Sequence, residues 1–327
     1  MNRLKKITAW TLVTLATIAV AFVAVVLVRS QRTFDAPYPQ IQASTDPAVI
    51  ERGRYLVYGP AHCVACHTPN EQEDAIKAGA TPPLIGGHKF ELPFGNVYGP
   101  NLTPDKETGI GRYTDGELAR TLRHGVMPGG RAAIPFMEFQ HLSDEDLTAV
   151  ISFLRAEKPV RNAVPDNELN FIGKAVMAFA MEPVGPSRPL LAKTPAEGTM
   201  ERGEYLATSV ANCAACHTKR NLVTGEFISA RFAGGMEFDV PGDEDRLVVS
   251  PNLTPSKTGR ITNWDEEQFL GRFAAGVGIR QSHMPWRQFQ KMSESDLRSI
   301  YRYLKTLQPV ENDPGPSLQV KKKGKKA

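Results

Sequence analysis

The chain is poor in cysteine, with four among its 327 residues. All four fall in two short strings of the form Cys-x-x-Cys-His, Cys63 to His67 and Cys213 to His217, so no thiol is left for a disulfide framework. The sequence also lacks a Gly-x-Gly-x-x-Gly segment after a strand pattern, and it lacks a P-loop. These absences exclude a hydride cofactor or a nucleotide bound through those motifs. Nothing in the sequence indicates nucleic-acid binding.

Each Cys-x-x-Cys-His string has the spacing of an attachment site for a c-type haem. Two thiols add across the haem vinyl groups, and the adjacent histidine becomes the fifth ligand of iron. The sequence therefore predicts two covalently bound haem c groups, each with its iron. The residues predicted to hold them are Cys63, Cys66, His67, Cys213, Cys216 and His217. A zinc ion held by four thiolates and thioredoxin-like dithiol pairs are the alternatives, although neither needs the histidine.

Three groups of residues recur along the chain in the same order, at an offset of 150 or 151. The first group is the segment 51–69, which contains the first Cys-x-x-Cys-His string and matches 201–219. The second is Pro-Asn-Leu-Thr-Pro, which begins at Pro100 and again at Pro251. The third is a Phe-Gln pair followed by an acidic Ser-x-x-Asp-Leu segment. This order indicates a duplicated domain rather than a solenoid.

We place the two domains at residues 45–160 and 195–312, joined by a linker at 161–194 that is rich in proline and polar residues. The linker contains an apolar stretch, Phe171 to Met181, which is too short to span a membrane. We expect it to form a helix packed between the two domains. Contact with a membrane surface is the alternative.

The N-terminus contains the one long apolar run of the sequence. Residues 7–28 are uncharged, which is long enough for a transmembrane helix. Basic residues precede the run, so the positive-inside rule places the N-terminus in the cytoplasm and the remaining chain on the periplasmic side of a bacterial cytoplasmic membrane. We expect a retained single-pass anchor, because no small-x-small cleavage site lies near Arg29. A cleaved signal peptide is the alternative, and it would also export the chain.

The net charge of +4 comes from the two ends of the chain. Eight basic residues lie there, and without them the rest of the chain carries a charge of −4; they are Arg3, Lys5, Lys6, Lys321, Lys322, Lys323, Lys325 and Lys326. We expect residues 313–327 to form a disordered basic tail.

Within each repeat the pattern is mainly helical, with long loops and little strand signal. The segments starting at Glu51 and Glu201 resemble short helices, each with one glycine, and Gly53 and Gly203 would let another helix cross closely. A third helix is expected to start at a Thr114–Glu117 capping box and to end at Gly125. The last segment of each repeat is an amphipathic helix capped by serine, Ser143 or Ser293.

With these features the chain resembles a class I cytochrome c, and more narrowly the cytochrome c subunits of membrane-bound bacterial alcohol, gluconate and sugar dehydrogenases. The resemblance covers both repeats, although those subunits usually carry three haem motifs. It implies a mainly α fold of two tandem class I cytochrome c domains behind a transmembrane helix. It also implies that a carbonyl of the Pro-Asn-Leu-Thr-Pro loop accepts a hydrogen bond from the histidine ligand. Residues of that loop (Asn101, Thr103, Asn252 and Thr254) are candidates for contacts with haem propionates, or simply for turn formation.

In such cytochromes a methionine sulfur is the sixth ligand of iron, on a loop before the last helix. In repeat two we predict Met284, in a Met-Pro-Trp string, with His283 as a weaker rival and core packing as the other use of this methionine. In repeat one a gapless alignment puts Ile134 opposite Met284. Met137 becomes the ligand if the loop is shortened after it.

Other ligands of the first iron stay open. Met127 is the second choice of methionine. A histidine, His124 or His141, and an open site are the remaining alternatives for that haem.

The resemblance implies a membrane-anchored dihaem cytochrome that relays single electrons on the periplasmic side. Electrons would arrive from a dehydrogenase and leave towards quinone or a terminal oxidase. We expect an electron-transfer protein rather than an enzyme, with no catalytic residue. The alternatives are a haem enzyme resembling a dihaem peroxidase, with an open iron in the first domain, and a passive anchor subunit that only docks a catalytic partner.

Overall fold

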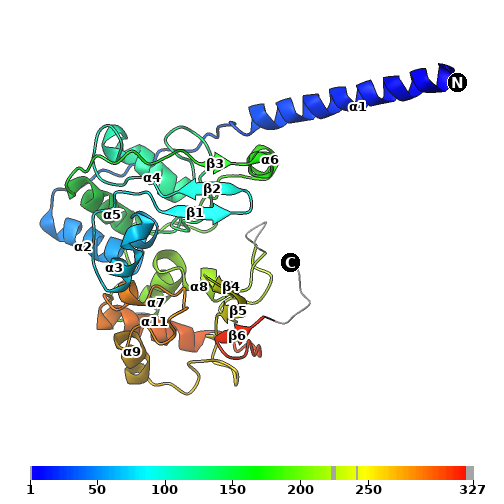
Figure 1. Cartoon of the computed structure of the whole chain (residues 1–327). Helices are drawn as coiled ribbons and strands as arrows, with labels where there is room; N and C mark the ends of the chain where they lie inside the picture. The colour runs from blue at the N-terminus through cyan, green and yellow to red at the C-terminus, as the bar shows by residue number, and fades with distance from the viewer. Residues whose placement is uncertain (1, 222–225, 241, 322–327) are drawn as a thin grey trace.

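The computed structural model describes residues 2–221, 226–240 and 242–321. Figure 1 shows two lobes side by side and one long helix, α1 (Asn2–Arg29), that extends away from the first lobe. The predicted apolar run, 7–28, lies within α1. Nearly all of its residues are exposed, and the helix is long and apolar enough to cross a bilayer.

The first lobe contains repeat one, and its sheet strands lie in the order β1-β2-β3. Its elements are α2 (Pro47–Tyr58), 3-10 turns at Cys63–Ala65, Asn70–Gln72 and Ile110–Arg112, α3 (Glu73–Lys77), β1 (Lys89–Leu92), β2 (Gly95–Tyr98), α4 (Asp115–His124), α5 (Asp144–Ala156) and β3 (Glu168–Leu169). The helix α6 (Phe171–Phe179) follows β3.

The second lobe contains repeat two and has the same arrangement of a helix pair, a haem-motif turn and an antiparallel sheet in the order β4-β5-β6. Its elements are α7 (Met200–Tyr205) with a π turn at Leu206–Val210, α8 (Cys213–Cys216), β4 (Glu237–Val240), β5 (Asp243–Val249), α9 (Glu266–Ala274), α10 (Trp286–Phe289), α11 (Glu294–Thr306) and β6 (Leu318–Val320).

The helix boundaries follow their capping residues. The Thr114 side chain accepts from the backbone N–H of Glu117, whose carboxylate accepts from Thr114 in return, so the predicted capping box begins α4. Gly125 ends α4 in the left-handed conformation, with φ of 62°. Ser143 and Ser293 cap α5 and α11, as predicted. Sequence reasoning missed a second capping box, Asp265 with Gln268, at the start of α9.

The two glycines in the first helix of each repeat are required by close helix crossings. A Cβ added to Gly53 would lie 1.9 Å from the carbonyl oxygen of Ala149 in α5, and one added to Gly203 would lie 1.9 Å from that of Ser299 in α11. The predicted role of both glycines is confirmed, because backbone meets backbone at these points.

The sheets differ from the predicted boundaries. Glu168–Leu169 pairs with β2, although it was assigned to the linker, and Leu318–Val320 pairs with β5, although it was assigned to a disordered tail. Short strands of this kind form through long-range pairing, which leaves little local signal. A missed signal existed for the first boundary, since Pro159-Val160-x-Asn162 recurs as Pro309-Val310-x-Asn312 and extends the repeat past residue 160. The tail prediction for 322–327 lies outside the described residues.

The prediction that the linker helix packs between the two domains is wrong. The helix α6 lies against the last turns of α1, where Phe22 contacts Phe171 and Phe179 with ring centroids 6.2 Å apart in each pair. The sequence shows an apolar face on this stretch but not which apolar neighbour covers it.

A single hydrophobic core runs through both lobes. Buried residues of α2 and α5 in the first lobe and of α7 and α11 in the second belong to one contiguous cluster. The two lobes therefore share one contiguous core rather than forming two separately packed domains.

Candidate haem-attachment sites

Both Cys-x-x-Cys-His strings form a single tight turn. His67 donates its backbone N–H to the carbonyl of Cys63 at 3.0 Å, and His217 donates to that of Cys213 at 2.9 Å. The residue before each turn is left-handed, with φ of 40° at His62 and 49° at Asn212. In repeat two both thiols lie on one short helix, α8, and in repeat one Cys66 caps the 3-10 turn that begins at Cys63; the histidine follows at once in each.

The two histidines of the strings are held in the same way. His67 Nδ1 lies 3.0 Å from the carbonyl oxygen of Pro100, and His217 Nδ1 lies 3.0 Å from that of Pro251. A carbonyl oxygen only accepts, so Nδ1 carries the proton and Nε2 keeps its lone pair. Burial lowers the pKa of both imidazoles, which keeps them neutral. The expected loop carbonyl is therefore present in both repeats, and each histidine fits a metal ligand.

The thiols fit covalent attachment better than the alternatives. Burial raises the pKa of Cys63 and Cys213 to about 12 and that of Cys66 to about 11, the opposite of an activated redox pair. All four cysteines are free of disulfides. Over the described residues, 2–221, 226–240 and 242–321, no three Cys, His, Asp or Glu side chains gather into a possible metal site, so the four-thiolate zinc arrangement is not formed.

The asparagine and threonine side chains of the Pro-Asn-Leu-Thr-Pro loop form hydrogen bonds that hold the loop in its conformation. Asn101 donates to the carbonyl of Val160 at 2.9 Å, and its side-chain oxygen accepts from Thr103 at 2.8 Å. Asn252 makes the same bonds to Val310 and Thr254, at 2.8 Å each. All four loop side chains are buried. Turn formation rather than propionate binding explains them, because their polar atoms are used inside the protein.

The candidate methionines lie in different environments. Met137 and Met284 are half-buried and pack against the core of their lobes. Met127 is exposed and lies in a surface turn, where its carbonyl accepts from Gly130 at 2.7 Å. The environments of these side chains favour Met137 over Met127.

Two of the histidine alternatives, His141 and His283, hydrogen-bond to other parts of the protein. His141 Nε2 accepts from the backbone N–H of Ser187 at 3.0 Å. His283 Nε2 lies 2.8 Å from the carbonyl oxygen of Asp239, so that nitrogen carries a proton rather than a free lone pair. His124 is the last residue of α4 and is half-buried beside Gly185.

The sequence did not reveal a reciprocal pair of tyrosine–aspartate hydrogen bonds between the lobes, called here the inter-lobe lock. Tyr55 of repeat one donates to Asp296 of repeat two at 2.6 Å, and Tyr205 of repeat two donates to Asp146 of repeat one at 2.8 Å. Each carboxylate also pairs with an arginine of its own repeat, Arg202 or Arg52. A signal was present, because both repeats have an Arg-x-x-Tyr spacing before the string and a Ser-x-x-Asp spacing at the start of the last helix, but only tertiary structure shows the exchange of partners.

Both haem-attachment turns lie beside this interface. The His62 ring, directly before Cys63, packs on Phe289 of repeat two at 5.8 Å. Arg220, four residues after Cys216, pairs with Glu138 of repeat one at 2.8 Å. The lobes therefore bring the two attachment turns towards each other rather than to opposite ends of the molecule.

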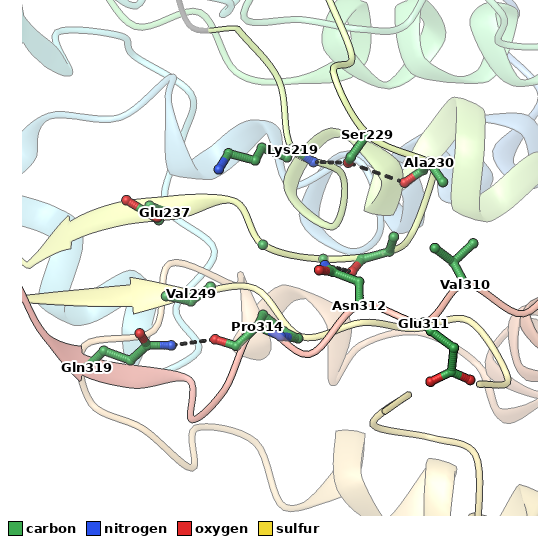
Figure 2. A pocket seen from close by; sticks show the side chains of 13 residues that line it. Lys219, Ser229, Ala230, Glu237, Val249, Val310, Glu311, Asn312, Pro314 and Gln319 are labelled. Atoms are coloured by element: carbon green, nitrogen blue, oxygen red, sulfur yellow. Dashed lines mark hydrogen bonds between the residues drawn. The ribbon is translucent and has the colours of Figure 1, made fainter. Parts of the chain in front are cut away.

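A separate cleft of about 440 Å³ lies in the second lobe, beside the loop that follows His217 (Figure 2). Lys219, Glu237 and Glu311 line it, and Asn312 closes one side through a bond to the carbonyl of Ala233 at 2.7 Å. None of its lining residues is a cysteine or histidine of the strings or a candidate methionine. The cleft is therefore distinct from the attachment site.

Comparison with known proteins gives these sites a family. Residues 50–158 match the cytochrome c family and form a cytochrome c domain. The chain is 32% identical over 289 residues to the cytochrome c subunit of a quinone-type alcohol dehydrogenase from Gluconacetobacter polyoxogenes, covering 83% of this chain and 58% of that protein. It is 31% identical over 286 residues to the gluconate 2-dehydrogenase cytochrome c subunit of Pantoea cypripedii, covering 80% and 60%.

A third relative, a dihaem c-type cytochrome of Cereibacter sphaeroides, is 28% identical over 270 residues, covering 78% of this chain and 85% of that protein. The chain thus resembles cytochrome c subunits of bacterial dehydrogenases, although it spans only about three-fifths of the length of the dehydrogenase subunits.

Proposed function

We propose that this chain is a membrane-anchored dihaem c-type cytochrome that relays single electrons between a dehydrogenase and the respiratory chain. One observation carries the proposal: both lobes present a Cys-x-x-Cys-His turn whose buried histidine is bonded through Nδ1 to a loop carbonyl. Cys63, Cys66 and His67 would hold one haem, and Cys213, Cys216 and His217 the other. A bound haem c supplies the one-electron couple of its iron.

The duplicated arrangement supports two tandem cytochrome c domains. Repeat two reproduces the helix crossing at Gly203, the serine cap of the last helix and the histidine–carbonyl bond of repeat one. We propose Met284 as the sixth ligand in the second domain and Met137 in the first. Both are half-buried and pack against the hydrophobic core, where the apolar thioether of methionine is accommodated without burying a polar group.

Contacts of α1 support a retained anchor over a cleaved signal peptide. Val26 is fully buried, Phe22 packs on two rings of α6, and Arg29 at the end of the helix lies 5.4 Å from the ring of Phe179. Cleavage after α1 would strip this apolar face of α6 of its cover. We therefore propose a single pass through the cytoplasmic membrane, with both lobes in the periplasm.

The partners follow from the relatives. Besides the alcohol and gluconate dehydrogenase subunits, the relatives include the fructose dehydrogenase cytochrome subunit of Gluconobacter japonicus, so we propose a dehydrogenase as electron donor. Quinone or a terminal oxidase is proposed as acceptor, because a membrane anchor keeps the chain near both.

The test uses membranes of a bacterium that makes the full chain. Ethanol, fructose or gluconate is added anaerobically, and reduction of c-type haem is followed by its absorbance; the same membranes then report substrate-driven oxygen uptake. We expect one substrate to reduce the haem, and Cys213→Ala/Cys216→Ala to abolish the oxygen uptake while the first haem stays attached. Full oxygen uptake in that variant would contradict the electron relay.

A further inference from the structure

The helix α6 presents an apolar face that the rest of the described chain covers only in part. Phe171, Ile172 and Phe179 are all exposed, and Ile172 is 64% exposed. The helix has a single charge, Lys174, in its nine residues. Its inner face is fixed, since Gly173 and Ala178 are buried.

Two attachments hold α6 in place. Towards the first lobe, Asn170 caps the helix and donates to the carbonyls of Phe94 and Pro93 at 3.1 and 3.0 Å. A Cβ at Gly173 would lie 2.3 Å from the Phe94 carbonyl oxygen, so the glycine allows the helix to touch this hairpin. Towards α1, Arg29 donates to the carbonyl of Ala178 at 3.4 Å and lies 5.4 Å from the ring of Phe179.

The contacts with α1 set the depth of α6. Arg29 is the first charged residue after the apolar run, and such residues lie at the headgroup level of a bilayer. Phe22 precedes it by seven residues, which is about 10 Å along a helix. Because Phe22 touches both Phe171 and Phe179, α6 lies within about 10 Å of the headgroup level, the depth range of interfacial helices.

We infer that α6 is a second membrane-contacting element, seated in the outer leaflet beside α1, and that its occupant is the phospholipid bilayer. The inference rests on the proposed anchoring by α1. The exposed face of α6 continues the apolar surface of α1, so one lipid environment covers both. With one lysine, α6 is held by apolar burial and by its tether rather than by attraction to anionic lipid.

A consequence is a fixed orientation. The helix bridges α1 and the β1–β2 hairpin of the first lobe, so it fixes how that lobe is held against the anchor (Figure 1). A single flexible connection after α1 would leave the lobes free to rotate relative to the anchor. The contacts of α6 with both α1 and the hairpin prevent that rotation.

Site-directed spin labelling of the full holoprotein in phosphatidylcholine nanodiscs tests this inference. The native cysteines are consumed by haem attachment, so an introduced cysteine is the one free thiol. Labels are placed at Ile172→Cys on α6, at Val20→Cys on α1 and, as a matched control, at Ile228→Cys in the second lobe, where the isoleucine is 59% exposed. Collision with oxygen, which partitions into lipid, is compared with collision with a water-soluble nickel chelate.

We expect the Ile172 and Val20 labels to favour oxygen and the Ile228 label to favour the nickel chelate. A chelate-accessible Ile172 label with an oxygen-accessible Val20 label would overturn the inference and leave the anchor standing. An Ile172 label shielded from both reagents would show a protein partner or second copy on α6, which also overturns it. A chelate-accessible Val20 label would contradict the anchor itself.

Discussion

The two repeats agree at the attachment turns and differ in the loop that precedes the last helix. In repeat two, Trp286 follows Met284-Pro285, lies 5.7 Å from Phe273 and has the guanidinium of Arg272 3.7 Å from its ring. In repeat one, Phe136 follows Ile134-Pro135 and is exposed. Both repeats thus keep the carbonyl contact that fixes the histidine, whereas the loops before the last helix differ in sequence and in packing.

One local turn is nevertheless common to both loops. Phe136 donates its N–H to the carbonyl of Ile134 at 2.7 Å, and Trp286 donates to that of Met284 at 2.7 Å. The shared turn keeps Ile134 in register with Met284, and Met137 lies three residues further on. On the proposed assignment, the two loops share a backbone turn, while the proposed sulfur ligand lies three residues further along the chain in repeat one than in repeat two.

The largest expected effect comes from replacing the proposed methionine ligands, one repeat at a time. Met284→Leu should let about half of the dithionite-reduced haem bind carbon monoxide, because leucine cannot bind iron. Met137→Leu should do the same for the other half. The measurement is the carbon monoxide difference spectrum, scaled to total haem, with the exposed Met127→Leu as control. Binding to half the haem of the unaltered protein would remove Met137 as a ligand and favour the haem-enzyme alternative.

Replacing the glycine at either helix crossing by alanine should lower the stability of the protein by the same amount. Gly53→Ala and Gly203→Ala each drive a methyl group to 1.9 Å from a backbone oxygen, and each should lower the free energy of unfolding by about 3 kcal/mol. Gly271→Ala, in α9 with nothing within 4 Å, is the matched control and should raise it by up to about 1 kcal/mol. Denaturant unfolding followed by circular dichroism checks this; one crossing variant behaving like the control would break the equivalence.

The two aspartates of the inter-lobe lock should differ in how much stability is lost when each is replaced by alanine. Asp296→Ala leaves Arg202, whose side chain is 5% exposed, without its carboxylate, and should cost about 3–5 kcal/mol of unfolding free energy. Asp146→Ala should cost less, because Arg52 is 25% exposed and can reach water. Glu73→Ala, which breaks an exposed pair with Lys77, should change little. Equal losses for both aspartates in the same unfolding assay would contradict this asymmetry.

The smallest expected effect is a change in pH dependence at the residue before the first attachment turn. Burial lowers the pKa of His62 below its ordinary value, so the unfolded chain takes up a proton that the folded chain refuses. Stability should therefore fall as the pH falls from about 6.5 towards about 5. His62→Asn, which copies the left-handed Asn212 of repeat two, should flatten that slope. An unchanged slope in urea titrations at several pH values would exclude this group as the cause.

The parts of the molecule that sequence predicted are those specified by local chemistry. The Cys-x-x-Cys-His turns, the capping box at Thr114 and the crossing glycines each depend on a few neighbouring residues or on one contact type. The parts that it missed depend on distant partners. Strand β6 exists only because β5 pairs with it, α6 is placed by Phe22 of α1, and the exchange of Tyr55 and Tyr205 is visible only once the lobes meet.

The measurement that tests the central claim most directly is the haem content of the full chain after extraction with acidified acetone, which removes haem that is not covalently bound. A pyridine haemochrome spectrum then gives the number of covalent haems per chain. We expect two haems of c type per chain, falling to one in Cys63→Ala/Cys66→Ala and to one in Cys213→Ala/Cys216→Ala. A single retained haem in the unaltered chain, or none, would contradict it.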